Sequence, residues 1–191
     1  MKKMIIILGT VLILSISISL LATGPFDPFF SRFKNSFAKK DYLSALKSLR
    51  SSLQLFWKQS PLLVDNVRFV KGENNSYGIY TPKYGDKFTK GEPVYLYMEP
   101  VGYTIKKSPK GFYEFGFTAD FYLTDKDGKI LGGQKDFAKL NFKTWNFNTE
   151  VALTFTYTFS GLKKGRYKII THLKDKNSDK KVITEKWINI I

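Results

Sequence analysis

The sequence contains no cysteine and a single histidine. Without cysteine the chain can form no disulfide, thiolate metal site or catalytic thiol, and none follows its N-terminal apolar segment to carry a lipid. Catalysis by a serine–histidine or related arrangement needs a base that titrates near neutral pH, normally histidine. The one candidate, His172, shares a predicted strand face with Lys168, Ile170 and Lys174 and is expected to face solvent. We therefore expect no enzyme activity, no metal site and no cofactor.

Acidic residues and arginine are also scarce. The chain has 31 basic and 16 acidic residues, a net charge of +15, and its basic residues are nearly all lysine. Lysine lacks the planar fork with which arginine reads bases or binds phosphate through two hydrogen bonds. Lysines spread along a chain are more typical of solubility, or of loose attraction to anionic lipid or polysaccharide, than of a nucleic-acid site. We expect a basic protein with no nucleic-acid partner.

The N-terminal segment predicts export. Met1-Lys2-Lys3 is a short basic start, and Met4–Ala22 is an uncharged run rich in isoleucine and leucine. The order of parts is that of a signal peptide, although the run is also long enough to cross a bilayer as a helix. We interpret residues 1–24 as a signal peptide or a membrane anchor. Both place residues 25–191 outside the cytoplasm, in the periplasm or at the cell surface, and the anchor would hold them at the inner membrane. Membrane contact is expected only through this segment, if it stays uncleaved.

Residues 25–60 change from proline-rich to helical. Pro25–Phe30 holds two prolines and is expected to be an extended lead-in. From residue 31 to 58 apolar side chains recur every three to five positions, which predicts an amphipathic helix. Asp41 is placed to cap a second helical piece after a break at Lys39-Lys40. The apolar stripe has two interpretations: it packs on the domain that follows, or it is a docking or dimerising helix.

From residue 61 onward the apolar period becomes two, which predicts a β-sandwich domain over residues 61–191. Seven or eight strands follow one another with no helix between them, so the fold class is mainly β with antiparallel sheets. Asp125–Gly128 is expected to turn a hairpin. The predicted core between the two sheets is aromatic and consists of Phe115, Phe117, Phe121, Phe155, Tyr157 and Tyr167.

The end of the chain resembles a known fold family. Leu162-x-x-Gly165-x-Tyr167, followed by alternating residues, a polar hairpin and a last strand, is similar to the end of immunoglobulin-like and fibronectin-like domains. In those domains a tyrosine after the turn forms a hydrogen bond back across the corner. The wider layout, with Gly91-Glu92-Pro93 before a tyrosine-rich strand, resembles that of uncharacterised exported bacterial proteins with such a sandwich. The resemblance implies an immunoglobulin-like β-sandwich and no particular function.

A surface of tyrosines and carboxylates is the candidate ligand site. Strand alternation predicts an outward position for Tyr95, Tyr97, Glu99, Asp120 and Tyr122. Exposed tyrosine beside carboxylate suits sugar rings and protein contacts equally. We expect a non-enzymatic exported envelope protein, a protein–protein interaction or structural module whose partner is another envelope protein. The alternative is a carbohydrate-binding module that binds polysaccharide on this face. A third interpretation is that the helix of residues 31–58 covers the face and makes the tyrosines part of a core.

Overall fold

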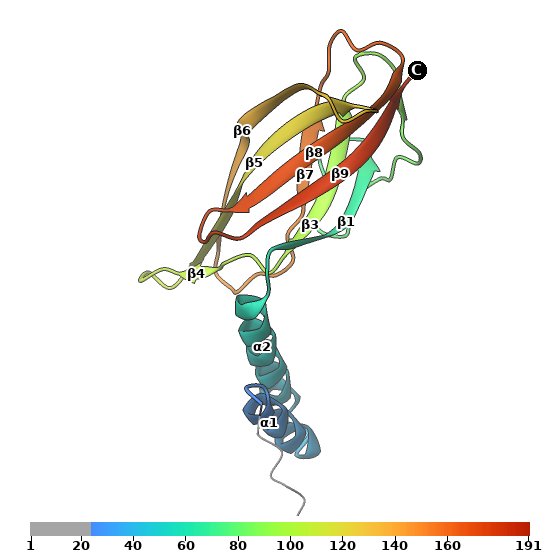
Figure 1. The fold of residues 1–191 in the computed structure, drawn as a ribbon. Helices are drawn as coiled ribbons and strands as arrows, with labels where there is room; N and C mark the ends of the chain where they lie inside the picture. Colours follow the sequence, from blue (N-terminus) through green and yellow to red (C-terminus); the bar gives the residue numbers. More distant parts are fainter. Residues whose placement is uncertain (1–23) are drawn as a thin grey trace, which may run out of the picture. The chain divides into compact units, whose positions relative to one another are not determined.

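A computed structural model describes residues 24–191 of the chain. Within these residues the protein is mainly β, with two helices ahead of the strands in the chain (Figure 1). In chain order the elements are α1 (Asp27–Ala38), α2 (Tyr42–Gln59), β1 (Leu63–Val70), β2 (Lys87–Phe88), β3 (Val94–Val101), β4 (Lys106–Lys107), β5 (Tyr113–Asp125), β6 (Ile130–Thr144), β7 (Leu153–Tyr157), β8 (Gly165–Asp175) and β9 (Lys181–Ile190). None of the helices within this described range is both long and apolar enough to cross a bilayer. The apolar run Met4–Ala22 lies outside the described residues.

The chain divides into two compact units, one ending at Leu49 and the other comprising Arg50–Ile191. In the first unit, α1 begins at Asp27, so the prediction of an extended lead-in over residues 25–30 is wrong. Pro28 lies in the first helical turn. Proline is tolerated there because its missing amide hydrogen would have no partner within the helix.

The predicted break between two helical pieces is confirmed. Lys40 takes a left-handed backbone conformation, with φ of 59°, which ends α1. Asp41 then caps α2, because its carboxylate accepts a hydrogen bond from the amide of Ser44 at 3.1 Å.

Two sheets make up the strand region. One sheet has the order β1-β3-β7, and the other has the order β2-β9-β8-β5-β4, with β6 also paired to β5 (Figure 1). Most strand pairs are antiparallel, as predicted from the hairpins. The exception is the two-residue strand β2, which lies parallel to the end of β9. The long connection after β1 carries this short strand back to the sheet edge, where Phe88 is buried.

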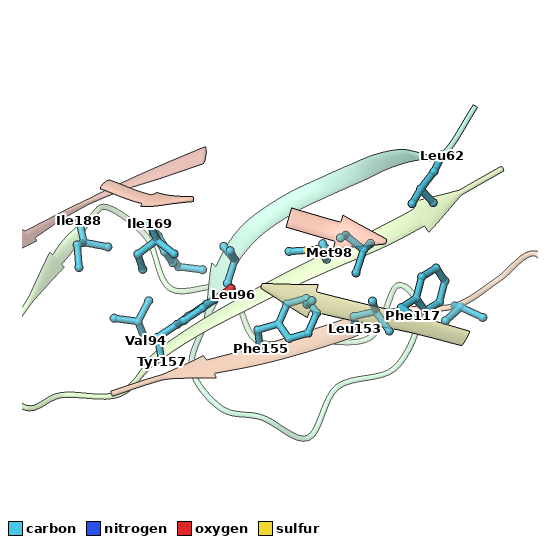
Figure 2. Packing of buried hydrophobic residues seen from close by; sticks show 14 of the residues in the cluster. Leu62, Val94, Leu96, Met98, Phe117, Leu153, Phe155, Tyr157, Ile169 and Ile188 are labelled. Atoms are coloured by element: carbon cyan, nitrogen blue, oxygen red, sulfur yellow. The ribbon is translucent and has the colours of Figure 1, made fainter. Parts of the chain in front are cut away.

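The hydrophobic core lies between the inner faces of the two sheets. Val94, Leu96 and Met98 alternate along β3, next to the core residues of β7 in the same sheet. Figure 2 shows these residues packed together with core residues of β5, β8 and β9 from the other sheet. Ring contacts cross from one sheet to the other, with centroids 5.3 Å apart for Phe121 and Tyr157. The predicted core residues Phe115, Phe117, Phe155 and Tyr157 are buried in this cluster, while Phe121 and Tyr167 are half-buried against it.

The end of α2 belongs to the second unit and packs on its core. The indole Nε1 of Trp57 donates to the carbonyl of Tyr103 at 2.8 Å, and the two rings meet edge to face. Beside them, Gly102 has φ of +78°, and an added Cβ would lie 2.1 Å from the carbonyl oxygen of Pro61. Only glycine fits this close approach. Within this unit, the last turn of α2 therefore packs on the strand domain.

Candidate functional site

The structure does not bring the five predicted site residues together. Tyr95, Tyr97 and Glu99 point away from the core on β3, and Asp120 and Tyr122 do so on β5. The two strands belong to different sheets. Because the inner faces of both sheets meet in one core, the outer faces lie on opposite sides of the domain. Alternation predicted the outward direction but could not assign the strands to sheets.

The outer face of β3 is covered, although Tyr97 and Glu99 were expected at the surface. Tyr97 is fully buried and Glu99 is 8% exposed. The connection after β1, residues 71–84, lies over them: the amide of Gly78 donates to the hydroxyl oxygen of Tyr97 at 2.9 Å, and the side chain of Asn75 donates to Thr154 at 3.1 Å. A ligand could reach Tyr97 and Glu99 only if this connection moved.

A buried polar network holds that connection in place. The hydroxyl of Tyr97 donates to Glu99 Oε1 at 2.6 Å, and the side-chain Nδ2 of Asn66 donates to the same oxygen at 2.9 Å. The ring of Tyr80 lies against that of Tyr97, with centroids 4.5 Å apart, and Arg68 lies over Tyr80. Burial, followed by the hydrogen bond to Glu99, raises the pKa of Tyr97 above its usual value. The phenol therefore stays a hydrogen-bond donor at neutral pH, and the network is structural. The connection supplies the cover that we had considered for the helix of residues 31–58.

On the other sheet, Asp120 lies at a bulge between β5 and β6. Asp120 is 3% exposed. Its carboxylate accepts a hydrogen bond from the backbone amide of Asp136 at 2.8 Å and forms an ion pair with Lys174. Burial alone would raise the pKa of Asp120, but these two contacts outweigh it and lower that pKa below its usual value. The carboxylate is therefore ionised at neutral pH and is already paired.

Tyr122 belongs to a group of aromatic and basic side chains that sequence reasoning had not assembled. Its ring lies 5.2 Å from that of His172 on β8. On the same outer face, Arg166 and Lys168 of β8 each lie 5.1 Å from the ring centroid of Trp187 on β9. We call Tyr122, His172 and Trp187, with these two cations, the outer aromatic face.

The register of β8 and β9 creates this arrangement. Lys168 pairs directly with Trp187, and alternation turns both away from the core. The polar hairpin before β9 could have predicted that pairing, because a hairpin sets which residues lie opposite each other.

Among residues 24–191, no group of three or more histidine, aspartate or glutamate side chains could hold a metal ion. The outer aromatic face can instead stack planar groups on its rings and attract anions with its cations.

Comparison with known proteins gives little further guidance. No protein-family model matches the chain, and no curated protein matches it. Among solved structures, the chain is similar to the Pseudomonas fluorescens alkylpurine DNA glycosylase AlkC bound to DNA containing an abasic site analog. The identity is 10% and the TM-score 0.36, and the match covers 87% of this chain and 42% of that one. The chain thus spans less than half the length of that protein.

This finding contradicts three predictions from the sequence, because that protein is an enzyme and is bound to DNA. The first is the prediction of a non-enzymatic envelope module, with its carbohydrate-binding alternative. The second is the prediction of no enzyme activity, and the third is the prediction of an envelope-protein partner and no nucleic-acid partner. A likeness this weak transfers neither activity nor partner to the chain. The function proposed below rests on the side chains of this protein alone.

Proposed function

We propose that the outer aromatic face binds single-stranded nucleic acid. The observation that carries this proposal is the pair of cations, Arg166 and Lys168, at 5.1 Å from the ring of Trp187 on an outward sheet face. Proteins that bind single strands combine basic groups for the phosphates with aromatic side chains on which bases stack. The rings of Tyr122 and His172 contact each other on neighbouring strands of the same face and offer further stacking surface.

The charge on this face suits a polyanion. Four basic side chains point outward from β8 and β9, and the outward carboxylates of β5, β8 and β9 are Glu114, Asp120 and Glu185. Two of these carboxylates are bound to a lysine of the same face, Asp120 to Lys174 and Glu185 to Lys168. The cations therefore exceed the acids, and the net charge of +15 adds a long-range attraction.

The position of this face on the strands of a sheet favours a single strand over a duplex. Tyr122, His172 and Trp187 lie on three neighbouring strands of this sheet and are half-buried, so part of each side chain is open to a ligand. Reading a duplex takes an element that enters a groove, whereas unpaired bases can lie flat on a sheet.

Fluorescence anisotropy of a labelled oligothymidine tests the proposal on the full chain. Stacking contributes about 1–3 kcal/mol per base, so Trp187→Ala or Tyr122→Ala should weaken binding by roughly 5- to 150-fold. Trp145→Ala is the matched control, because Trp145 is an exposed tryptophan away from this face and should leave affinity unchanged. Equal affinity for dextran sulfate, a polyanion without bases, would overturn the proposal. So would equal binding by Trp187→Ala and the unaltered protein.

We further propose that the two sheets form an immunoglobulin-like sandwich. The support is the corner before β8, where the hydroxyl of Tyr167 donates to the carbonyl of Lys163 at 2.9 Å. That bond matches the tyrosine corner implied by the sequence resemblance. Tyr167→Phe should lower the free energy of unfolding by about 1 kcal/mol, because it removes one hydrogen bond. Unchanged stability in urea denaturation would mean that the tyrosine has no such corner role.

Export of residues 25–191 also remains a proposal, supported by the basic start and the apolar run Met4–Ala22. On that side of the membrane the bound polymer would be extracellular nucleic acid. Sequencing the N-terminus of protein from the native envelope should give a residue near Pro25, or the uncut segment in the membrane fraction. Full-length protein in the soluble cytoplasm would refute export and would leave the nucleic-acid-binding proposal unaffected.

A further inference from the structure

Residues 24–49, the described part of the first unit, carry an apolar surface that they do not themselves cover. Six large apolar side chains of α1 and the first half of α2 are each between 37% and 61% exposed: Phe30, Phe37, Tyr42, Leu43, Leu46 and Leu49. We call them the helical apolar surface. A globular domain rarely leaves so many large apolar groups together in water without a partner.

The surface is continuous across the connection between the helices. The ring of Phe37 lies 5.7 Å from Phe33 on α1 and 5.8 Å from Tyr42 at the start of α2. Along α2, Tyr42, Leu46 and Leu49 follow at spacings of four and three residues, which places them on one face of the helix.

Cations border this surface. Residues 24–49 contain five basic side chains, Arg32, Lys34, Lys39, Lys40 and Lys47, and two acidic ones, Asp27 and Asp41. Lys39 and Lys40 lie in the connection itself, next to Phe37 in the chain. An aromatic-rich apolar face bordered by lysine and arginine is the pattern of helices that lie in the surface of a bilayer.

We propose that the helical apolar surface lies in the headgroup region of an anionic phospholipid bilayer. Its charge complements that of such a surface, which attracts each nearby lysine or arginine. The position in the chain agrees, because the apolar run Met4–Ala22 ends only five residues before α1 begins at Asp27. A second copy of the chain is the less suitable occupant, since two such surfaces would bring their cations together.

The absence of cysteine allows a direct test on the full chain. Leu46→Cys and Lys47→Cys are each labelled with an environment-sensitive fluorophore. The protein is reconstituted in phosphatidylcholine vesicles with and without phosphatidylglycerol. The two positions are adjacent on α2 and point about 100° apart, so they form a matched pair. The label at residue 46 should be quenched by lipids that carry a quencher in the bilayer, and the label at residue 47 should be quenched mainly by aqueous iodide.

Charge removal separates this contact from insertion of the N-terminal run. Replacing Lys39 and Lys40 with glutamine should weaken the contact of the helical apolar surface with anionic vesicles. The equilibrium constant for this contact, reported by the label at residue 46, should fall by about fivefold per charge, roughly 25-fold in all. Helix content by circular dichroism confirms that the variant is folded. Free access of iodide to residue 46 in anionic vesicles would overturn the proposal. A second outcome would also overturn the proposal: the label at residue 46 is protected from iodide equally in detergent and in vesicles, and quenchers carried by the lipids do not affect it. That result would assign the surface to a contact with a second copy of the chain.

Discussion

The hydrogen bond between Tyr157 and Thr171 links the two sheets inside the core. Tyr157 lies on β7 and Thr171 on β8, their hydroxyl oxygens are 2.7 Å apart, and the residues are 2% and 0% exposed. Burial raises the pKa of Tyr157, so the pair stays neutral across the working pH range. Removing one partner leaves the other hydroxyl buried without a bond, which costs about 1–3 kcal/mol.

Two single substitutions and their combination measure this cost. Tyr157→Phe and Thr171→Val should each lower the free energy of unfolding by about 1–3 kcal/mol. For a domain of this size, that corresponds to a fall in melting temperature of about 2–12 °C. The free energy of unfolding of the double variant should be no lower than that of the less stable single variant, because neither hydroxyl is then left unpaired.

Thermal and urea unfolding followed by circular dichroism gives all three values. Tyr84→Phe is the control, because Tyr84 is 88% exposed and its hydroxyl should contribute nothing measurable. If the losses of the two single variants simply add in the double variant, the two hydroxyls are not coupled. The reasoning about a bond between the sheets would then fail.

Three further predictions concern the core, a close backbone contact and an ion pair. Phe117→Ala should lower the free energy of unfolding by about 3–5 kcal/mol in urea denaturation, because Phe117 is fully buried. Thr156→Ala should change it by less than about 0.5 kcal/mol, because the side chain of Thr156 is exposed. Gly102→Ala should prevent stable folding, seen as loss of soluble protein, because its Cβ would overlap the Pro61 carbonyl. Asp120→Asn should cost about 1–3 kcal/mol at pH 7. The pKa of Asp120 is lower in the folded protein than in the unfolded chain. The stability difference between Asp120→Asn and the unaltered protein should therefore be full above the pKa of the unfolded state and should shrink as the pH falls through the pKa of the folded state. A difference that does not change with pH would contradict the ion-pair argument.

Much of the local structure followed from the sequence. The change of apolar period after residue 60 separated helices from strands, and the residues facing inward on β5 and β7 were read correctly from alternation. The break at Lys40 and the cap at Asp41 were also predicted, because both depend on neighbouring residues only. The start of α1 was missed, since proline was taken to exclude a helix where it occupies the first turn.

The candidate site depended on contacts that no local pattern contains. Alternation alone determined that Tyr97, Glu99, Asp120 and Tyr122 point away from the core. Sheet membership placed the first two on one side of the domain and the others on the opposite side. Only the path of residues 71–84 buried Tyr97 and Glu99. The register of β8 with β9 brought Arg166 and Lys168 to Trp187. Side-chain direction is a property of each strand, whereas burial and proximity depend on which strands pair and what the loops between them cover.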